Sequence, residues 1–332
     1  MTDEKPVRKI SWAKRIGFLA AVLILLAVFA ECGLRGFKHL TRPDASAQAQ
    51  QNDCEAVVFL CLGDSMAYGL GAERDESFPA RLPAHLNRRY SDVPIKVYNL
   101  AVPGSNTSEG LFILQKFFKE AENALPDYAL ILYGINNRWN LHMGSFWKWD
   151  ESARSEHYFD YLMSRLQLGK VVQLAALNQD AKKQVEAART ADPRKYRQML
   201  NEHGWDMFFK SFADELLAKW VIYDMVEMSR ILREHGVEPV FLTYHFEKFP
   251  HINDLIRHAA QKADAGLIDL EKPFQFYKSR DMLDKDYFHL NAKGYNELAK
   301  RIAEDFSDNC IRFPLIARLR AKEADRRCIA RR

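Results

Sequence analysis

The chain has 332 residues, of which 48% are hydrophobic and 28% charged, and its formal net charge is +4 at neutral pH. This length suits one α/β domain with insertions, or two small domains, and the composition is that of a globular protein. So small a net charge does not indicate nucleic-acid binding. The five cysteines form no CxxC motif or Cys/His cluster, so no metal site is predicted.

The first predicted element is a helix in a long apolar run. Residues 16–34 are apolar apart from glycines and Glu31, and the run approaches the roughly 20 residues that a helix needs to cross a bilayer. Lys14 and Arg15 precede it, and positively charged flanks stay on the cytoplasmic side. We therefore expect a cytoplasmic basic segment at 1–15 and a single-pass transmembrane signal anchor at 16–34.

Cleavage of this segment is the alternative. Val28-Phe29-Ala30 resembles a small-residue cleavage site, but Phe29 and the length of the apolar run favour an uncleaved anchor. A lipoprotein is not expected, because Glu31 precedes Cys32 where a small residue is needed. With or without cleavage, the main domain is predicted to lie on the extracytoplasmic side, periplasmic or extracellular, after a linker at 35–54.

Short apolar runs alternate with helical periods through the main domain, which we place at residues 55–309. Continuous apolar runs of strand length are typical of strands that are buried on both faces of a parallel sheet. Apolar residues at helical spacing separate these runs. The order predicts a three-layer α/β fold with right-handed crossovers. The strands are expected at 56–62, 95–100, 128–133, 239–244 and 266–270.

Two segments depart from this alternation. Residues 138–212 are polar and helix-prone, which predicts a helical insertion. An aromatic patch near its start could stack on sugars, lie at a membrane interface or pack the insertion onto the domain. Residues 310–332 form a basic tail, either bound to an anionic surface or solvated. Cys54 and Cys310 flank the main domain, where a disulfide is possible in an oxidising compartment.

Ligands of parallel α/β folds bind beyond the carboxyl ends of the strands. Gly63-Asp64-Ser65 directly follows the first strand, so the Ser65 hydroxyl projects from a rigid strand end, as a nucleophile requires. Asp64 is interpreted as a residue that shapes this turn. Far along the chain, His289 follows Asp286 by three residues, and a carboxylate at this spacing can orient an imidazole toward a serine.

Each of these signals has a structural alternative. Ser65 could be the N-cap of the next helix, His289 a capping or core histidine, and Asp286 an ordinary turn residue. Gly104 could be only a turn glycine, and Asn136 a loop residue that satisfies its own backbone. His245, which follows the fourth strand, either lines the pocket or is a surface or core residue.

Four short blocks follow one another along the chain. They are Leu62-Gly63-Asp64-Ser65, Asn99-Leu100-Ala101-Val102-Pro103-Gly104, Gly134-Ile135-Asn136 and Asp286-Tyr287-Phe288-His289. In this order the blocks make the chain resemble the SGNH (GDSL-like) hydrolase superfamily. The resemblance covers roughly residues 56–306, with the 138–212 insertion outside it. It implies a flavodoxin-like parallel sheet in a three-layer α/β/α fold.

The resemblance also implies a role for each matched position. Ser65 is the nucleophile, His289 the general base and Asp286 the residue that orients it. The backbone N–H groups of Ser65 and Gly104 and the side-chain amide of Asn136 form the oxyanion hole. The family usually has Asp where Asn137 stands, and we expect the chemistry to survive this change. A GxSxG nucleophile elbow is absent, since Ala67 stands at its second glycine.

Three functions follow as hypotheses. The first is a membrane-held serine esterase that hydrolyses O-acyl esters of a carbohydrate or lipid. The second is an O-acyltransferase with the same triad, for which a single helix offers no obvious route for an acyl donor. The third is a non-catalytic binding or assembly protein, against which the complete set of Ser65, Asp286 and His289 argues. No cofactor, metal or nucleic-acid partner is predicted; the expected partners are the acylated substrate and the membrane.

Overall fold

The computed structural model describes residues 12–40, 56–88, 90, 94–120, 125–138, 140, 146, 151, 155, 166, 214–245, 250–271, 280–284 and 289–308. Several predictions fall outside these residues. They concern Asp286, the disulfide between Cys54 and Cys310, the basic tail at 310–332 and nearly all of the helical insertion at 138–212.

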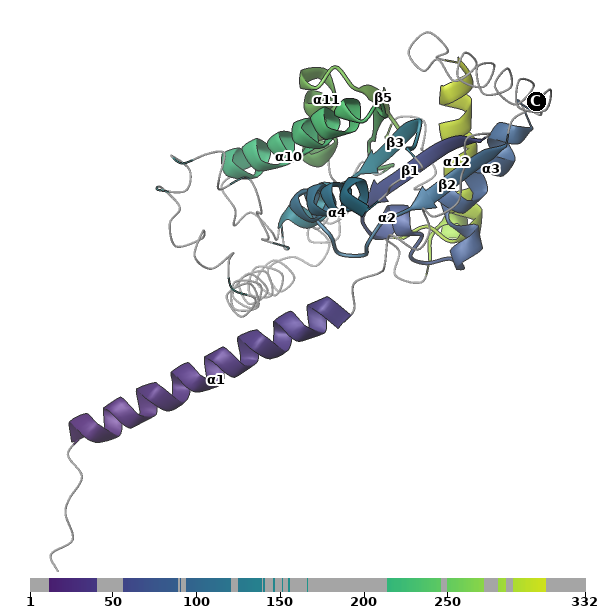
Figure 1. Ribbon diagram of the computed structural model, residues 1–332. Helices are drawn as coiled ribbons and strands as arrows, with labels where there is room; N and C mark the ends of the chain where they lie inside the picture. The colour runs from purple at the N-terminus through teal and green to yellow at the C-terminus, as the bar shows by residue number, and fades with distance from the viewer. Residues whose placement is uncertain are drawn as a thin grey trace, which may run out of the picture.

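A five-stranded parallel sheet forms the centre of the domain, in the order β2-β1-β3-β4-β5 (Figure 1). Each strand overlaps one of the predicted apolar runs, so the expected parallel sheet is confirmed. Every residue of the inner strand β1 is buried, because helices cover both faces of the sheet. The strands are β1 (Val57–Gly63), β2 (Ile95–Asn99), β3 (Tyr128–Leu132), β4 (Glu238–Leu242) and β5 (Gly266–Ile268).

Two groups of helices enclose the sheet (Figure 1). On one side α3 (Phe78–Asn87) packs against α12 (Ala292–Asp308). On the other side α10 (Asp214–Glu234) packs against α4 (Thr107–Glu120) and α11 (Pro250–Lys262). The result is the predicted three-layer arrangement. Shorter helices are α2 (Ser65–Tyr68) and the 3₁₀ turns at Arg74–Glu76, Ile135–Arg138 and Arg280–Met282.

Aromatic rings join the layers at the amino-terminal end of the sheet. Phe59 of β1 stacks on Tyr128 of β3, with 5.2 Å between ring centroids. Phe306 of α12 meets both rings edge to face, at 5.3 and 5.4 Å. Cys61, also on β1, is fully buried, which raises the pKa of its thiol and makes it an unreactive core residue.

The strand order also sets where a ligand can bind. The chain passes from β1 to β2 on one side and then returns to β3 on the other side of β1. Such a reversal opens a crevice beyond the carboxyl ends of the two central strands. Gly63 and Leu132 are paired at these ends. The segments after β1, β2 and β3 therefore meet at one edge of the sheet, where the predicted site residues lie.

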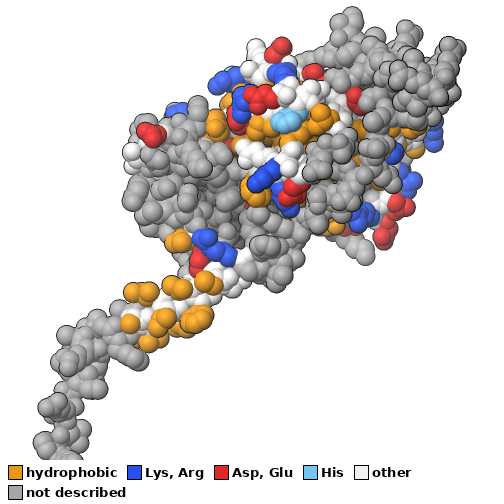
Figure 2. All heavy atoms as spheres, in the orientation of Figure 1, with side chains coloured by type: hydrophobic (Ala, Val, Ile, Leu, Met, Phe, Trp, Pro, Cys, Tyr) orange, Lys and Arg blue, Asp and Glu red, His pale blue; other side chains and the backbone are white. Residues whose placement is uncertain are grey.

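Helix α1 (Trp12–Leu40) contains the predicted 16–34 segment. Hydrophobic side chains along it are exposed, including Leu23, Ile24 and Phe29 (Figure 2). Toward its end, Glu31 and Arg35 form an ion pair at 2.7 Å. Within the described residues, no helix combines the length and apolar character that crossing a membrane requires. The helix is thus confirmed, whereas its transmembrane character is not.

Candidate active site

Ser65 is the first residue of α2 and lies just beyond the carboxyl end of the inner strand β1. Asp64 caps this helix, because its Oδ1 accepts a hydrogen bond from the Met66 N–H at 2.9 Å. The turn is tightly packed: a Cβ on Gly63 would lie 2.4 Å from the Cβ of Ala67. Asp64 therefore shapes the turn as predicted, and Ser65 is not the N-cap of the helix.

The structure brings together Ser65 and His289, which are 224 positions apart in the chain. The His289 Nε2 lies 2.9 Å from the Ser65 Oγ. In the tautomer that carries its proton on Nδ1, Nε2 accepts the serine hydroxyl, at a distance suited to a general base. The His289 backbone is held in turn, since its carbonyl accepts the Asp284 N–H at 2.8 Å. His289 can therefore take the proton of the Ser65 hydroxyl as the serine oxygen attacks a carbonyl carbon.

His245 is buried at the end of β4, near His289. Burial, and to a smaller extent the charge of His289, lower the pKa of the His245 imidazole to about 3. His245 is thus a neutral core histidine at physiological pH, one of the two alternatives that its position left open. Among the described residues, no group of His, Cys, Asp and Glu side chains is placed to hold a metal ion.

Hydrogen bonds connect the three loops that carry the predicted oxyanion-hole residues. The Gly63 carbonyl, at the end of β1, accepts the Val102 N–H at 3.0 Å and the Ser105 hydroxyl at 3.2 Å. The Ser105 carbonyl accepts the Asn136 side-chain N–H at 3.0 Å. Gly104, between Val102 and Ser105, has the positive φ of 75° that favours glycine. The Gly104 and Asn136 loops are therefore held against the turn before Ser65.

Asn140 helps to hold the Gly104 loop in place, although nothing in the sequence pointed to it. Its side-chain N–H groups donate to the Gly104 carbonyl at 2.9 Å and to the Glu109 carboxylate at 2.6 Å. Its own carbonyl accepts the Asn106 amide. A lone asparagine in a polar stretch carries no signal of such contacts, because they depend on how three loops fold together.

Asn137, where the family usually has Asp, belongs to a buried network. It accepts the Thr107 N–H at 3.2 Å, and its amide donates to the Thr107 hydroxyl oxygen at 2.7 Å. The Thr107 hydroxyl donates onward to Asp224 on α10 at 2.7 Å. Ser108 and Trp220 donate to the same carboxylate oxygen, Oδ2. The carboxyl group of this network is therefore that of Asp224, on α10, and does not directly follow Asn136.

Asp224 makes the stability of the fold depend on pH. Burial raises the pKa of its carboxyl to about 7, whereas the unfolded value is about 4. The folded state thus holds the proton more tightly, and binding of the proton to Asp224 stabilises the fold. This stabilisation is fully present below about pH 4 and is lost as the pH rises to about 7. We expect the free energy of unfolding, relative to Asp224→Asn, to fall by more than about 1.4 kcal/mol across this range.

Urea denaturation of both proteins at a series of pH values measures this difference. The amide of the variant keeps an oxygen for the three donors but does not titrate in this range. A difference between wild type and variant that stays constant from pH 4 to pH 7 would contradict the raised pKa.

Gly71 lies against the His289 segment. Its φ is +102°, and a Cβ there would lie 2.5 Å from the Leu290 carbonyl oxygen and 3.2 Å from the Cβ of His289. We expect Gly71→Ala to displace His289 and to lower kcat for ester hydrolysis about tenfold or more, because small misplacements of catalytic groups are costly. Steady-state kinetics on short esters measure this loss.

Gly236→Ala is the matched control for Gly71→Ala. Gly236 has a φ of +73°, with no atom within 4 Å of the position that a Cβ would take. Its substitution adds a similar backbone strain of about 1–2 kcal/mol far from His289. Equal kcat values for the two variants would show that contact with His289 has no effect on catalysis.

The sequence model of the GDSL-like lipase/acylhydrolase family matches residues 61–296, which is more than half of the chain. The matched range holds Ser65, Gly104, Asn136 and His289. A comparison with curated proteins finds no match.

Several solved structures are similar to the chain at low identity. One is a psychrotrophic esterase, EstA, from Pseudoalteromonas sp., with 12% identity and a TM-score of 0.44 over 76% of this chain and 97% of that one. Another is TesA, with 14% identity and a TM-score of 0.43 over 75% and 97%. A third is a lipase/acylhydrolase from Enterococcus faecalis, with 13% identity and a TM-score of 0.42 over 75% and 94%.

Proposed function

Because the chain belongs to the GDSL-like lipase/acylhydrolase family and is an ester-bond hydrolase of that type, we propose that it hydrolyses O-acyl esters of a carbohydrate or lipid. Ser65 is the nucleophile, His289 the general base and Asp286 its orienting carboxylate. The observation that supports this proposal most is the 2.9 Å distance between the His289 Nε2 and the Ser65 Oγ. A serine hydroxyl needs such a base to become a nucleophile.

Hydrolysis then proceeds in two halves. The Ser65 Oγ attacks the acyl carbonyl carbon while its proton passes to the His289 Nε2. The resulting oxyanion is stabilised by the N–H groups of Ser65 and Gly104 and by the Asn136 amide. When the ester C–O bond breaks, His289 returns the proton to the leaving alcohol, and an acyl-Ser65 remains. Water attacks this intermediate with His289 again as base, releasing the carboxylic acid and restoring the serine.

The test uses the purified full-length chain, a p-nitrophenyl acetate or butyrate assay and a fluorophosphonate probe. We expect hydrolysis of the ester and a single phosphonylated peptide that contains Ser65. Loss of both signals after heat denaturation is the control for a folded active site. If the chain showed no turnover of the ester and no labelling by the probe, the serine-hydrolase function would be rejected. Acyl transfer to an added sugar faster than to water would instead support the O-acyltransferase.

We propose further that α1 holds the enzyme at a membrane, with the catalytic domain on the extracytoplasmic side. The exposed apolar side chains of α1, among them Leu23, Ile24 and Phe29, support this proposal, since contiguous exposed apolar surface is typical of membrane or protein contacts. Expressed in bacteria, the chain should remain with membranes after a high-salt wash, and detergent should release it. Recovery in the soluble fraction would contradict the proposal.

A further inference from the structure

The hydroxyl of Tyr244 contacts both the turn before Ser65 and the turn before Asn136. Tyr244 follows β4 and is fully buried. Its hydroxyl donates to the Asp64 Oδ2 at 2.6 Å and accepts the Ile135 N–H at 3.3 Å. Asp64 directly precedes Ser65, and Ile135 directly precedes Asn136. One oxygen atom therefore connects the turn of the nucleophile with the turn of an oxyanion-hole donor.

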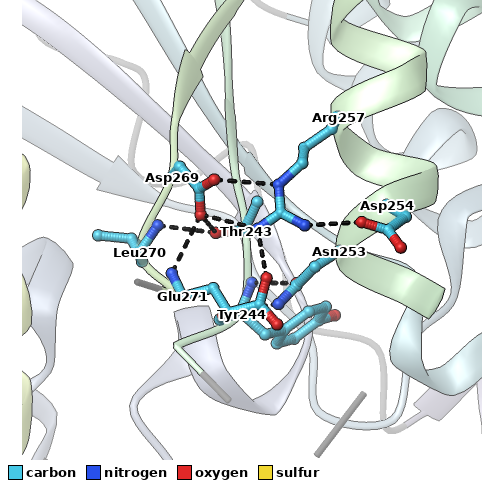
Figure 3. A network of polar contacts seen from close by, with 8 residues as sticks. All are labelled: Thr243, Tyr244, Asn253, Asp254, Arg257, Asp269, Leu270 and Glu271. Atoms are coloured by element: carbon cyan, nitrogen blue, oxygen red, sulfur yellow. Dashed lines mark hydrogen bonds and ion pairs between the residues drawn. The ribbon is translucent and has the colours of Figure 1, made fainter. Parts of the chain in front are cut away.

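The backbone of Tyr244 is itself fixed. Asn253 of α11 accepts the Tyr244 N–H at 2.8 Å and donates to the Tyr244 carbonyl at 2.9 Å (Figure 3). These two bonds satisfy both backbone groups of Tyr244. Asn253 is fully buried, so water does not compete for these groups. The tyrosine ring thus extends toward the site from a rigid base.

Thr243, which precedes Tyr244, forms hydrogen bonds with the residues that follow β5. The Thr243 hydroxyl donates to Asp269 at 3.1 Å and accepts the Leu270 N–H at 2.7 Å. Arg257 of α11 donates to both Asp269 carboxylate oxygens at 3.0 Å, and it also pairs with Asp254 and Glu271 (Figure 3). A bidentate guanidinium–carboxylate pair fixes direction as well as distance. The network in Figure 3 therefore anchors the carboxyl end of β4.

We propose that Tyr244 is a positioning residue that holds the Ser65 turn and the Asn136 turn in the relative placement that catalysis needs. The inference rests on the proposed function of Ser65 and Asn136, and it adds a residue that follows β4, outside the four matched blocks. Tyr244→Phe would leave the Asp64 Oδ2 and the Ile135 N–H without this partner. Both groups belong to buried residues, so the two turns would shift to find others.

The test compares wild type, Tyr244→Phe, Asp64→Asn and the double variant in the full-length chain. We expect Tyr244→Phe to lower kcat about tenfold or more, with KM changed less than about twofold, because the loss is one of placement rather than of substrate contact. Fluorophosphonate labelling of Ser65 should slow by a similar factor. The double variant should be no slower than the slower single variant, since both changes break the same contact.

Tyr128→Phe is the matched control, because it removes the hydroxyl of another fully buried tyrosine, at the opposite end of the sheet. Its kcat should stay at the wild-type value even if its melting temperature falls. If Tyr244→Phe does not fold, Asp64→Asn alone carries the test, with the same tenfold loss expected.

Two results would overturn the inference alone: Tyr244→Phe turning over and labelling at the wild-type rate, or losses that multiply in the double variant. Absence of labelling in the wild-type chain would instead reject the function of Ser65, and this inference with it. The labelling rates of wild type and Tyr244→Phe therefore separate the two failures.

Discussion

Replacing Ser65 by alanine is expected to lower kcat for ester hydrolysis by about 10⁴-fold or more, since the variant lacks the hydroxyl that we propose forms the acyl-enzyme. The variant should keep the melting temperature of the wild type, because the hydroxyl is only partly buried and its described partner is the His289 imidazole. Hydrolysis of p-nitrophenyl esters measures the rate. Ser229→Ala on α10, at a buried serine outside the site, is the matched control and should hydrolyse esters at the wild-type rate.

His289→Ala should show a loss of similar size. The two residues act as a unit, so the variant that lacks both side chains should be no slower than the slower single variant. Residual hydrolysis above the water rate would come from the oxyanion hole and substrate binding. If Ser65→Ala hydrolysed esters as fast as Ser229→Ala, Ser65 would not be the nucleophile.

Asn136→Ala is expected to lower kcat by about 10²–10³-fold, which corresponds to about 3–4 kcal/mol of transition-state stabilisation. The amide stabilises charge that develops only during the reaction, so KM should change little. In the structure the Asn136 side chain is buried, and its N–H donates to the Ser105 carbonyl. This contact orients the amide before substrate binds.

The same contact predicts a loss of stability in Asn136→Ala. The buried Ser105 carbonyl would lose a donor, at a cost of about 1–3 kcal/mol, so rates must be compared at a temperature where both proteins are folded. Asn87→Ala, at the exposed end of α3, is the control for loss of an asparagine elsewhere. A kcat within about threefold of wild type would mean that less than about 1 kcal/mol of transition-state stabilisation is lost, and it would show that Asn136 is not part of the oxyanion hole.

Many features of the fold could be predicted from residues that are close together in the chain. The apolar run of β1 indicates a strand buried on both faces, because burial on both faces requires apolar residues at every position. Tyr295, Leu298 and Ile302 stand at helical spacing in the sequence, which indicates one apolar face of α12, and in the structure all three are at most 1% exposed. These signals are local, since the period of a helix or strand is set by its own backbone.

The short blocks also predicted the position of Ser65 at a strand end. In a parallel sheet, all carboxyl ends lie at one edge, so residues after different strands become neighbours whatever their separation in sequence. That rule placed Ser65, Gly104 and Asn136 at a common edge before any contact between their loops was known. For this protein, the sequence by itself thus determined the class of fold, and it predicted where the site lies and which serine is its nucleophile.

Only the tertiary structure decided which partners surround these residues. The 2.9 Å contact between Ser65 and His289 depends on how α12 packs against the sheet. The contacts of Tyr244 with Asp64 and of Asp224 with Thr107 join segments 180 and 117 positions apart. Hydrogen bonds need placement within a few tenths of an ångström, and that placement arises from the packing of the whole core rather than from any periodic pattern in the sequence.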